Sequence, residues 1–247
     1  MTFQPRHAIV TASGSGIGRA TAVALAGAGL NVGITWHTDE ADAEDTAEEV
    51  RQAGVTAEVA RLDTTDLSGC GDVVDELAGR LGGVDVFVNN AGAGTAPATR
   101  MALDLTLHEW RHVLVSDLDG AFACIQRAGR RMVGHGQGGR LIAVTGGDEH
   151  QPRAGSAAGH VAEQGLGGLM RTLALELDPY GITANCVTPG APGSGGAGRA
   201  GDAREVAAVI AFLASPRSAH VTGVSYVVDE GHAPAGSALI SDYWPTA

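Results

Sequence analysis

The chain has 247 residues, of which 44% are hydrophobic, and its formal net charge is −12. This composition argues against intrinsic disorder and predicts a globular protein with a substantial core. The negative charge argues against nucleic acid or an anionic membrane surface as a partner, since both attract Lys and Arg.

Short apolar segments alternate along the chain with longer amphipathic or alanine-rich segments. In chain order, strands are predicted at 7–11, 31–36, 56–62, 84–90, 139–145, 181–187 and 223–229. Helices are predicted at 18–29, 39–54, 67–82, from about 105 to 133, up to about 177, and at 202–215. Continuously apolar strands separated by helices indicate a parallel sheet covered on both faces. The sequence therefore predicts one α/β domain over 1–247, with a doubly wound, Rossmann-like sheet of seven parallel strands.

The sequence shows neither a signal peptide nor a membrane span. The N-terminus lacks the apolar core of a signal peptide, and no run approaches the ~18 apolar residues of a membrane span. We therefore expect a cytoplasmic protein. The last residues, 232–247, show no hydrophobic period and predict a tail that packs on the surface or at an interface with a neighbouring subunit.

A glycine-rich turn, TASGSGIG at 11–18, joins the first predicted strand to the first predicted helix. Glycines let the backbone approach a pyrophosphate, and a helix N-terminus supplies free N–H groups. Further polar or glycine-containing turns follow later strands, at Asp63, at 89–92 and at 188–190. Because ligands in this fold bind at the carboxyl ends of strands, the pattern predicts a ligand site there. The alternative for the first turn is a tight strand-to-helix connection without a ligand.

Together these motifs resemble the short-chain dehydrogenase/reductase family, over almost the whole chain from Thr11 to Gly231. The turn follows the family's T-G-x-x-x-G-x-G pattern, with Ala12 at its first glycine, and N-N-A-G is intact at 89–92. The resemblance implies an oxidoreductase that binds NAD or NADP and acts on a small molecule. The residues that it implies in cofactor binding are Thr11, Ser13, Gly16, Ile17, Gly18, His37, Asp63, Thr64, Asn90, Ala91, Gly92, Pro189 and Gly190.

The end of the second predicted strand bears on the choice between the two nucleotides. The family's NAD-selecting acid would fall near Trp36, so no carboxylate marks NAD. His37 and Thr38 could approach a 2′-phosphate, although no Arg or Lys is evident nearby, and we lean to NADP. If the position of Ala12 needs a positive φ, alanine costs on the order of 1 kcal/mol there.

The family's catalytic residues have no evident counterparts in this chain. In the family, a tyrosine exchanges a proton with the substrate, a lysine four residues on lowers its pKa, a serine orients the carbonyl, and an asparagine holds a water. Counting back from ALEL at 174–177, and from Trp110, places at the Ser, Tyr, Lys and Asn positions Gly146, Gly159, Glu163 and Asp117. A register slipped by one residue would place at the first three positions Gly147, His160 and Gln164. Either register lacks Ser, Tyr and Lys, and all 16 basic residues of the chain are arginine.

Several titratable residues remain near these positions, at 148–150, Asp117, His160 and Glu163. A histidine and a carboxylate can do general acid–base work near neutral pH, which makes Asp117, His160 and Glu163 the candidate catalytic residues. His160 and Glu163 would share a helix face. The alternatives are an interface histidine at 160, a solvated first-turn carboxylate at 163 and a water-binding carboxylate at 117. No compact spacing of ligands supports a metal site.

The link after Pro189-Gly190 has only ten residues, 191–200, where the family commonly carries lid helices. An open cleft follows, unless a neighbouring chain replaces the lid. Three functions stay open. The first is an atypical oxidoreductase that takes its proton from His160, Asp117 or water. The second is a non-redox cyclase, dehydratase or isomerase that uses His160 and Glu163. The third is a catalytically inactive nucleotide-binding subunit. The resemblance also implies a homodimer or homotetramer, or a hetero-oligomer with an active relative.

Overall fold

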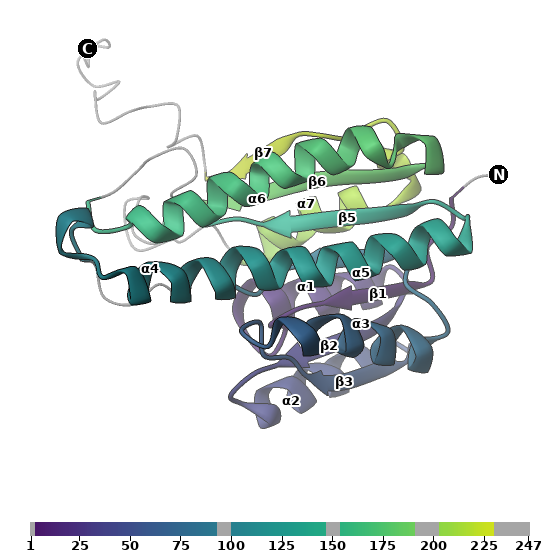
Figure 1. The fold of residues 1–247 in the computed structure, drawn as a ribbon. Coiled ribbons are helices and arrows are strands. Elements are labelled where there is room, and N and C mark those ends of the chain that lie inside the picture. The colour runs from purple at the N-terminus through teal and green to yellow at the C-terminus, as the bar shows by residue number, and fades with distance from the viewer. Residues whose placement is uncertain (1–2, 93–99, 147–153, 191–202, 230–247) are drawn as a thin grey trace, which may run out of the picture.

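A central parallel sheet lies between two layers of helices in the computed structural model, which describes residues 3–92, 100–146, 154–190 and 203–229 (Figure 1). The strands are β1 (His7–Val10), β2 (Asn31–Trp36), β3 (Ala57–Arg61), β4 (Val86–Asn89), β5 (Gly139–Val144), β6 (Ile182–Pro189) and β7 (Ser225–Val228). Their order in the sheet is β3-β2-β1-β4-β5-β6-β7, and every pairing is parallel. The predicted doubly wound, seven-stranded sheet is therefore confirmed.

The helices follow the predicted order with one interruption. They are α1 (Gly16–Gly27), α2 (Glu40–Gln52), α3 (Leu67–Leu81), α4 (Leu107–Leu114), α5 (Gly120–His135), α6 (Ala157–Glu176) and α7 (Ala203–Ala214), with short 3₁₀ turns at Ala102–Asp104, Asp178–Tyr180 and Pro216–Ser218. The long helix predicted from about 105 to 133 is divided by a π-helical turn at Val115–Asp119. Such turns are frequent at functional sites, and this one contains Asp117.

Each face of the sheet carries its own hydrophobic core. Ile9, Phe87 and Leu141 pack against α3, α5 and α6, whereas their strand neighbours Val88 and Ile142 pack against α1, α2 and α7. Successive side chains of a strand point to opposite faces, so strands buried on both sides must be apolar throughout. This requirement explains why the strands were visible in the sequence as continuous apolar runs.

Local capping interactions set several helix ends. The Asp39 carboxylate accepts a hydrogen bond from the N–H of Asp42 at the start of α2, and Asp66 does the same for α3. Thr106 and Glu109 form a reciprocal capping box at the start of α4. Each cap satisfies N–H groups that have no partner within the helix.

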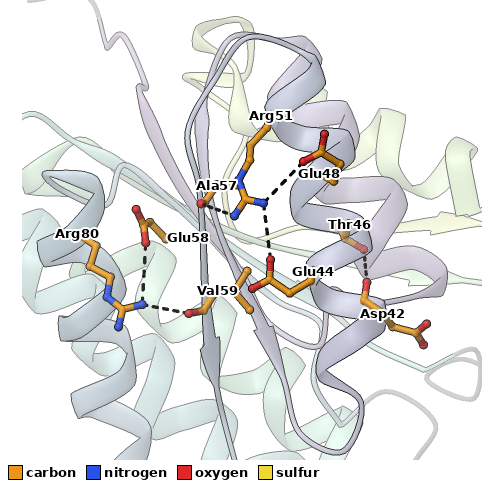
Figure 2. A network of polar contacts seen from close by, with 9 residues as sticks. All are labelled: Asp42, Glu44, Thr46, Glu48, Arg51, Ala57, Glu58, Val59 and Arg80. Carbon is orange, nitrogen blue, oxygen red and sulfur yellow. Dashed lines mark hydrogen bonds and ion pairs between the residues drawn. The ribbon is translucent and has the colours of Figure 1, made fainter.

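The free edge of the sheet at β3 is closed by arginines from both helix layers (Figure 2). Arg51 of α2 donates to the carbonyl oxygen of Ala57 at 3.4 Å, and Arg80 of α3 donates to that of Val59 at 3.1 Å. Arg51 is also paired with Glu44, with 3.6 Å between nitrogen and oxygen. Because these carbonyls would otherwise be open to another strand, the arginines protect the edge from intermolecular pairing.

The strand order changes direction between β1 and β4, and this switch point determines where a ligand crevice can form. The turns after these two strands, 11–18 and 89–92, meet there. No helix among the described residues is long and apolar enough to cross a membrane.

Candidate functional site

The glycine-rich turn is tied to the end of β4 by Thr11. The hydroxyl of Thr11 accepts hydrogen bonds from the backbone N–H groups of Asn90 (2.8 Å) and Ala91 (2.9 Å). In the other direction, the side-chain amide of Asn90 donates two hydrogen bonds, to the carbonyl oxygens of Thr11 (3.2 Å) and Ala12 (3.1 Å). Thr11 is fully buried. Its role in the predicted cofactor site is therefore to hold the two turns together, with its hydroxyl already used inside the protein.

Ser13 links the same turn to β2 by hydrogen bonds. Its buried hydroxyl donates to the carbonyl oxygen of Val10 at 2.8 Å and accepts from the N–H of Thr35 at 3.2 Å. The Ser13 N–H donates to the carbonyl oxygen of Thr35, and the Thr35 hydroxyl accepts from the N–H of Ala12. The conformation of the turn is thus fixed by β2 as well as by β4.

The backbone of the turn is strained at one position. Ala12 has a φ of 49°, the only positive φ of a non-glycine residue in the described part of the chain. The hydrogen bonds of its N–H and carbonyl group to Thr35 and Asn90 hold it there. The condition that the sequence left open is therefore met, and the strain is of order 1–2 kcal/mol.

Gly18 is required by the same close packing. A Cβ at this position would overlap the carbonyl oxygen of Ala12 and lie 2.7 Å from Nδ2 of Asn90. Gly16 and Ile17, the first residues of α1, are not capped by the side chain of Ser15, and the first turn of α1 contains no acidic residue. The start of α1 can therefore offer its N–H groups to an anion such as a pyrophosphate.

The ends of β2 and β3 come together around His37. Nε2 of His37 lies 3.4 Å from a carboxylate oxygen of Asp63. The hydroxyl and N–H of Thr65 both donate to Asp63 and, together with the nearby His37, hold the pKa of this carboxyl below its usual value. Thr64 lies one residue away, and its carbonyl oxygen packs against Gly120 at the start of α5.

Arg61 also lies at this edge, where we expected no basic side chain. Its guanidinium carbon lies 5.9 Å from the centre of the Trp36 ring, and its Nε donates to the carbonyl oxygen of His37 at 3.3 Å. Trp36 and Arg61 are register partners in the β2–β3 pairing. That pairing is the signal that could have located Arg61, because the two positions are 25 residues apart in sequence but adjacent in the sheet.

On the other side of the switch point, Asp117 faces the end of β4. A Cβ at Gly92, whose φ is +92°, would lie 3.2 Å from both Cβ and Oδ1 of Asp117. The hydroxyl of Ser116 makes a short hydrogen bond to the same oxygen. The structure thus places Asp117 beside the N-N-A-G turn.

Glu163, one turn into α6, points toward the end of β5. A Cβ at Gly146 would overlap Oε1 of Glu163 and lie 2.7 Å from its carboxyl carbon. The carboxylate of Glu163 therefore occupies the space that any side chain at position 146 would need. Gly159 lies one turn earlier, within the first turn of α6.

His160 is half-buried on α6. Its Nδ1 is shielded from solvent and makes no hydrogen bond to any described residue. A buried polar atom without a partner is costly in a native protein and is common where a ligand or a reacting group is expected. In the described part of the chain, no three His, Cys, Asp or Glu residues are grouped to hold a metal ion.

The ends of β5 and β6 and the start of β7 are joined by hydroxyl groups that the sequence did not reveal. The hydroxyl oxygens of Thr145 and Thr188 are 2.7 Å apart, and that of Ser225 lies 3.1 Å from Thr188. Pro189 ends β6, and the N–H of Gly190 donates to the carbonyl oxygen of Val228. The candidates at 148–150, the link 191–200 and the tail 232–247 lie outside the described residues.

Residues 6–203 match the family model described as short chain dehydrogenase. The chain belongs to the short-chain dehydrogenase family. An Escherichia coli K12 protein called uncharacterized oxidoreductase YohF is 49% identical over 185 residues, which are 74% of this chain and 72% of that protein. Acetoin dehydrogenase YohF from Salmonella typhimurium has a similar structure, with a TM-score of 0.90 and 41% identity over 96% of this chain and all of that chain. Acetoin dehydrogenase from Enterobacter cloacae also has a TM-score of 0.90, with 37% identity over 96% of this chain and 98% of the other.

Membership of the short-chain dehydrogenase family supports the oxidoreductase class and NAD(P) binding for this chain. The switch point between β1 and β4 fits that assignment, because it combines an open helix N-terminus with two turns joined by hydrogen bonds.

Proposed function

We propose that this chain is an NAD(P)-dependent oxidoreductase with a non-standard active site. The observation that carries the proposal is the carboxylate of Glu163 lying against Gly146. In the register that needs no insertion, these residues stand at the family's lysine and serine positions, and Gly159 stands at the tyrosine position. An anion there would raise the pKa of a phenol rather than lower it, so the tyrosine–lysine proton transfer does not operate.

The loss of that relay does not remove the redox chemistry. The hydride belongs to the nicotinamide, so a bound cofactor supplies it without a catalytic tyrosine. What the protein must still provide is one proton for the alkoxide that forms when a carbonyl accepts the hydride. We assign this role to His160, whose buried Nδ1 has no partner among the described residues, with Asp117 at the nucleotide rim as an accessory group.

The environment of His37 supports NADP as the preferred cofactor. Arg61 and His37 are adjacent at the end of β2, and a guanidinium is the group best suited to a phosphate. Asp39, the first acidic residue after β2, already caps α2. An Arg61→Gln variant should bind NADPH about tenfold more weakly and NADH with unchanged affinity. Arg80→Gln, on the far side of β3, is the matched control.

The substrate class is a small hydroxyketone or diketone. This choice rests on the two similar structures that are named acetoin dehydrogenases. We further propose one domain over 1–247, a cytoplasmic location and a homodimer or homotetramer. The exposed Tyr226 and Val227 of edge strand β7 support an interface there.

The deciding experiment combines a nucleotide titration with a turnover assay. We expect NADPH to bind, and acetoin or diacetyl to change its nicotinamide absorbance at a rate that falls by at least about tenfold in His160→Gln. His135→Gln, an exposed histidine at the end of α5, should keep the full rate. No binding of either nucleotide would refute the proposal. Binding without turnover would indicate an inactive partner subunit, and cofactor-free activity a non-redox enzyme.

A further inference from the structure

A pocket of about 490 Å³ lies at the opposite end of the sheet from the turns at 11–18 and 89–92. It is lined by the start of β5, the turn before β6 and the 3₁₀ turn after α7, and its residues include Arg140, Phe3, Tyr180 and Pro216. Arg140 is the second residue of β5, so the pocket sits at the amino ends of the strands. The volume is that of a typical small-molecule site.

Arg140 supplies the charged group of this pocket, where Gln137 is a further polar residue, and Arg140 is 1% exposed. Its guanidinium donates two hydrogen bonds, to the carbonyl oxygens of Gly139 (2.9 Å) and Ser215 (3.5 Å). Its Nε is buried and has no hydrogen-bond partner among the described residues. An arginine has five N–H donors, so most of its hydrogen-bonding capacity is unused.

The charge of Arg140 is also uncompensated within the described residues, where it joins no ion pair. The carboxylate of Asp85, whose backbone oxygen accepts from the N–H of Arg140, is used by the backbone N–H groups of Arg6 and His7. Burial lowers the pKa of Arg140 to about 10, with no opposing carboxylate to raise it. Buried charges are normally paired, so an isolated one calls for a partner from outside the chain.

The other residues that line the pocket indicate what kind of group the rest of the ligand carries. The Phe3 ring stacks over the guanidinium, with 3.9 Å from its centre to the guanidinium carbon. Stacking covers the flat face of the group and leaves its N–H edges, which lie in the plane, directed elsewhere. Tyr180, which is 51% exposed, Pro216 and Ala219 give the pocket an aromatic and aliphatic surface.

We infer that this pocket binds a small carboxylate with an aromatic or aliphatic body. The carboxylate would bond side-on to Nε and one terminal nitrogen of Arg140, in place of the long bond to Ser215, while the body would lie against Phe3 and Tyr180. A single cation selects a single negative charge. The inference does not depend on the proposed redox activity, since the two sites lie at opposite ends of the strands.

Calorimetric titration of the intact protein with benzoate tests the inference, with benzamide as the uncharged ligand of the same shape. We expect saturable, one-to-one binding of benzoate, no measurable binding of benzamide, and the same benzoate affinity when the protein is saturated with NADPH. Equal binding of benzoate and benzamide, or loss of benzoate binding when NADPH is bound, would refute the inference.

Two variants locate the bound ligand. Arg140→Gln should weaken benzoate binding by at least about tenfold, whereas Arg130→Gln, an exposed arginine of α5, should leave it unchanged. If Arg140→Gln does not fold, Tyr180→Ala at the exposed wall serves instead and should also weaken binding. Unchanged affinity in the folded variants at positions 140 and 180 would show that benzoate binds elsewhere.

Discussion

Replacing Gly146 by alanine tests the contact on which the proposed active site rests. The new Cβ would overlap Oε1 of Glu163 and lie 2.7 Å from its carboxyl carbon, a separation that real side chains do not tolerate. Overpacking of this kind costs about 1–3 kcal/mol. Because the obstructing atoms are the end of a flexible side chain that can rotate away, we expect the lower half of that range, about 1–2 kcal/mol. A domain of this size would lose roughly 2–8 °C in Tm.

A double-mutant cycle separates this clash from other effects of the substitution. Glu163→Ala removes the obstructing carboxylate, so Gly146→Ala should cost close to nothing in that background. The interaction energy between the two positions is then about 1–2 kcal/mol, measured by urea unfolding of the four proteins. Gly134→Ala in α5 is the control, because an added Cβ meets nothing within 4 Å there. It should stabilise the protein by up to about 1 kcal/mol.

Additivity would refute the reasoning. If Gly146→Ala costs the same in both backgrounds to within about 0.5 kcal/mol, the Glu163 carboxylate does not fill the space beside Gly146 in solution. The case for a Gly146–Glu163 contact between the end of β5 and the early part of α6 would then fail, while nucleotide binding at the turns after β1 and β4 would be unaffected.

Three further predictions concern the nucleotide half. Gly18→Ala should abolish NADPH binding in a titration and lower the Tm, because its Cβ would overlap the carbonyl oxygen of Ala12; Gly27→Ala, which has open space, should do neither. Ala12→Gly should raise the free energy of unfolding by about 0.5–1 kcal/mol, since relief of left-handed strain outweighs the added chain entropy; a loss of stability would contradict the positive φ of Ala12. Asp63 has a lowered pKa in the folded state, chiefly through Thr65, so its stabilising contribution is present above the unfolded pKa near 4 and is lost as the pH falls through the folded pKa. The stability difference between the wild type and Asp63→Asn should therefore shrink below about pH 4 in urea unfolding, and a constant difference would contradict the shift.

The fold was predictable because its signals are local. The strand at 31–36 has the predicted bounds, since a strand buried on both faces must be apolar throughout. The π-helical turn at Val115–Asp119 was not predictable. It lies where Gly120 packs on the Thr64 backbone and Gly165 on Leu118, and such contacts between distant segments leave no period in the sequence.

At the candidate site, too, the residues were predictable from local motifs, whereas their contacts were not. The positions of Thr11 and Asn90 followed from their motifs, but their mutual hydrogen bonds, which make the two turns one unit, depend on the pairing of β1 with β4. Arg61 was missed because its proximity to His37 comes from the register of two neighbouring strands. For Glu163 the residue was found, but its contact with Gly146 required the structure.

The two halves of the site tolerate sequence change in different ways. At Ala12 the backbone keeps a left-handed conformation despite its cost, because Thr35 and Asn90 hold it by hydrogen bonds on both sides. The geometry that receives a nucleotide is therefore retained when the glycine is not. At Gly146 the carboxylate of Glu163 fills the space that a side chain would need, so under the proposed assignment packing is retained while the chemical groups differ. Nucleotide affinity and proton transfer are thus expected to be separable in this chain, and Ala12 variants should change the first without altering the pH profile of the second.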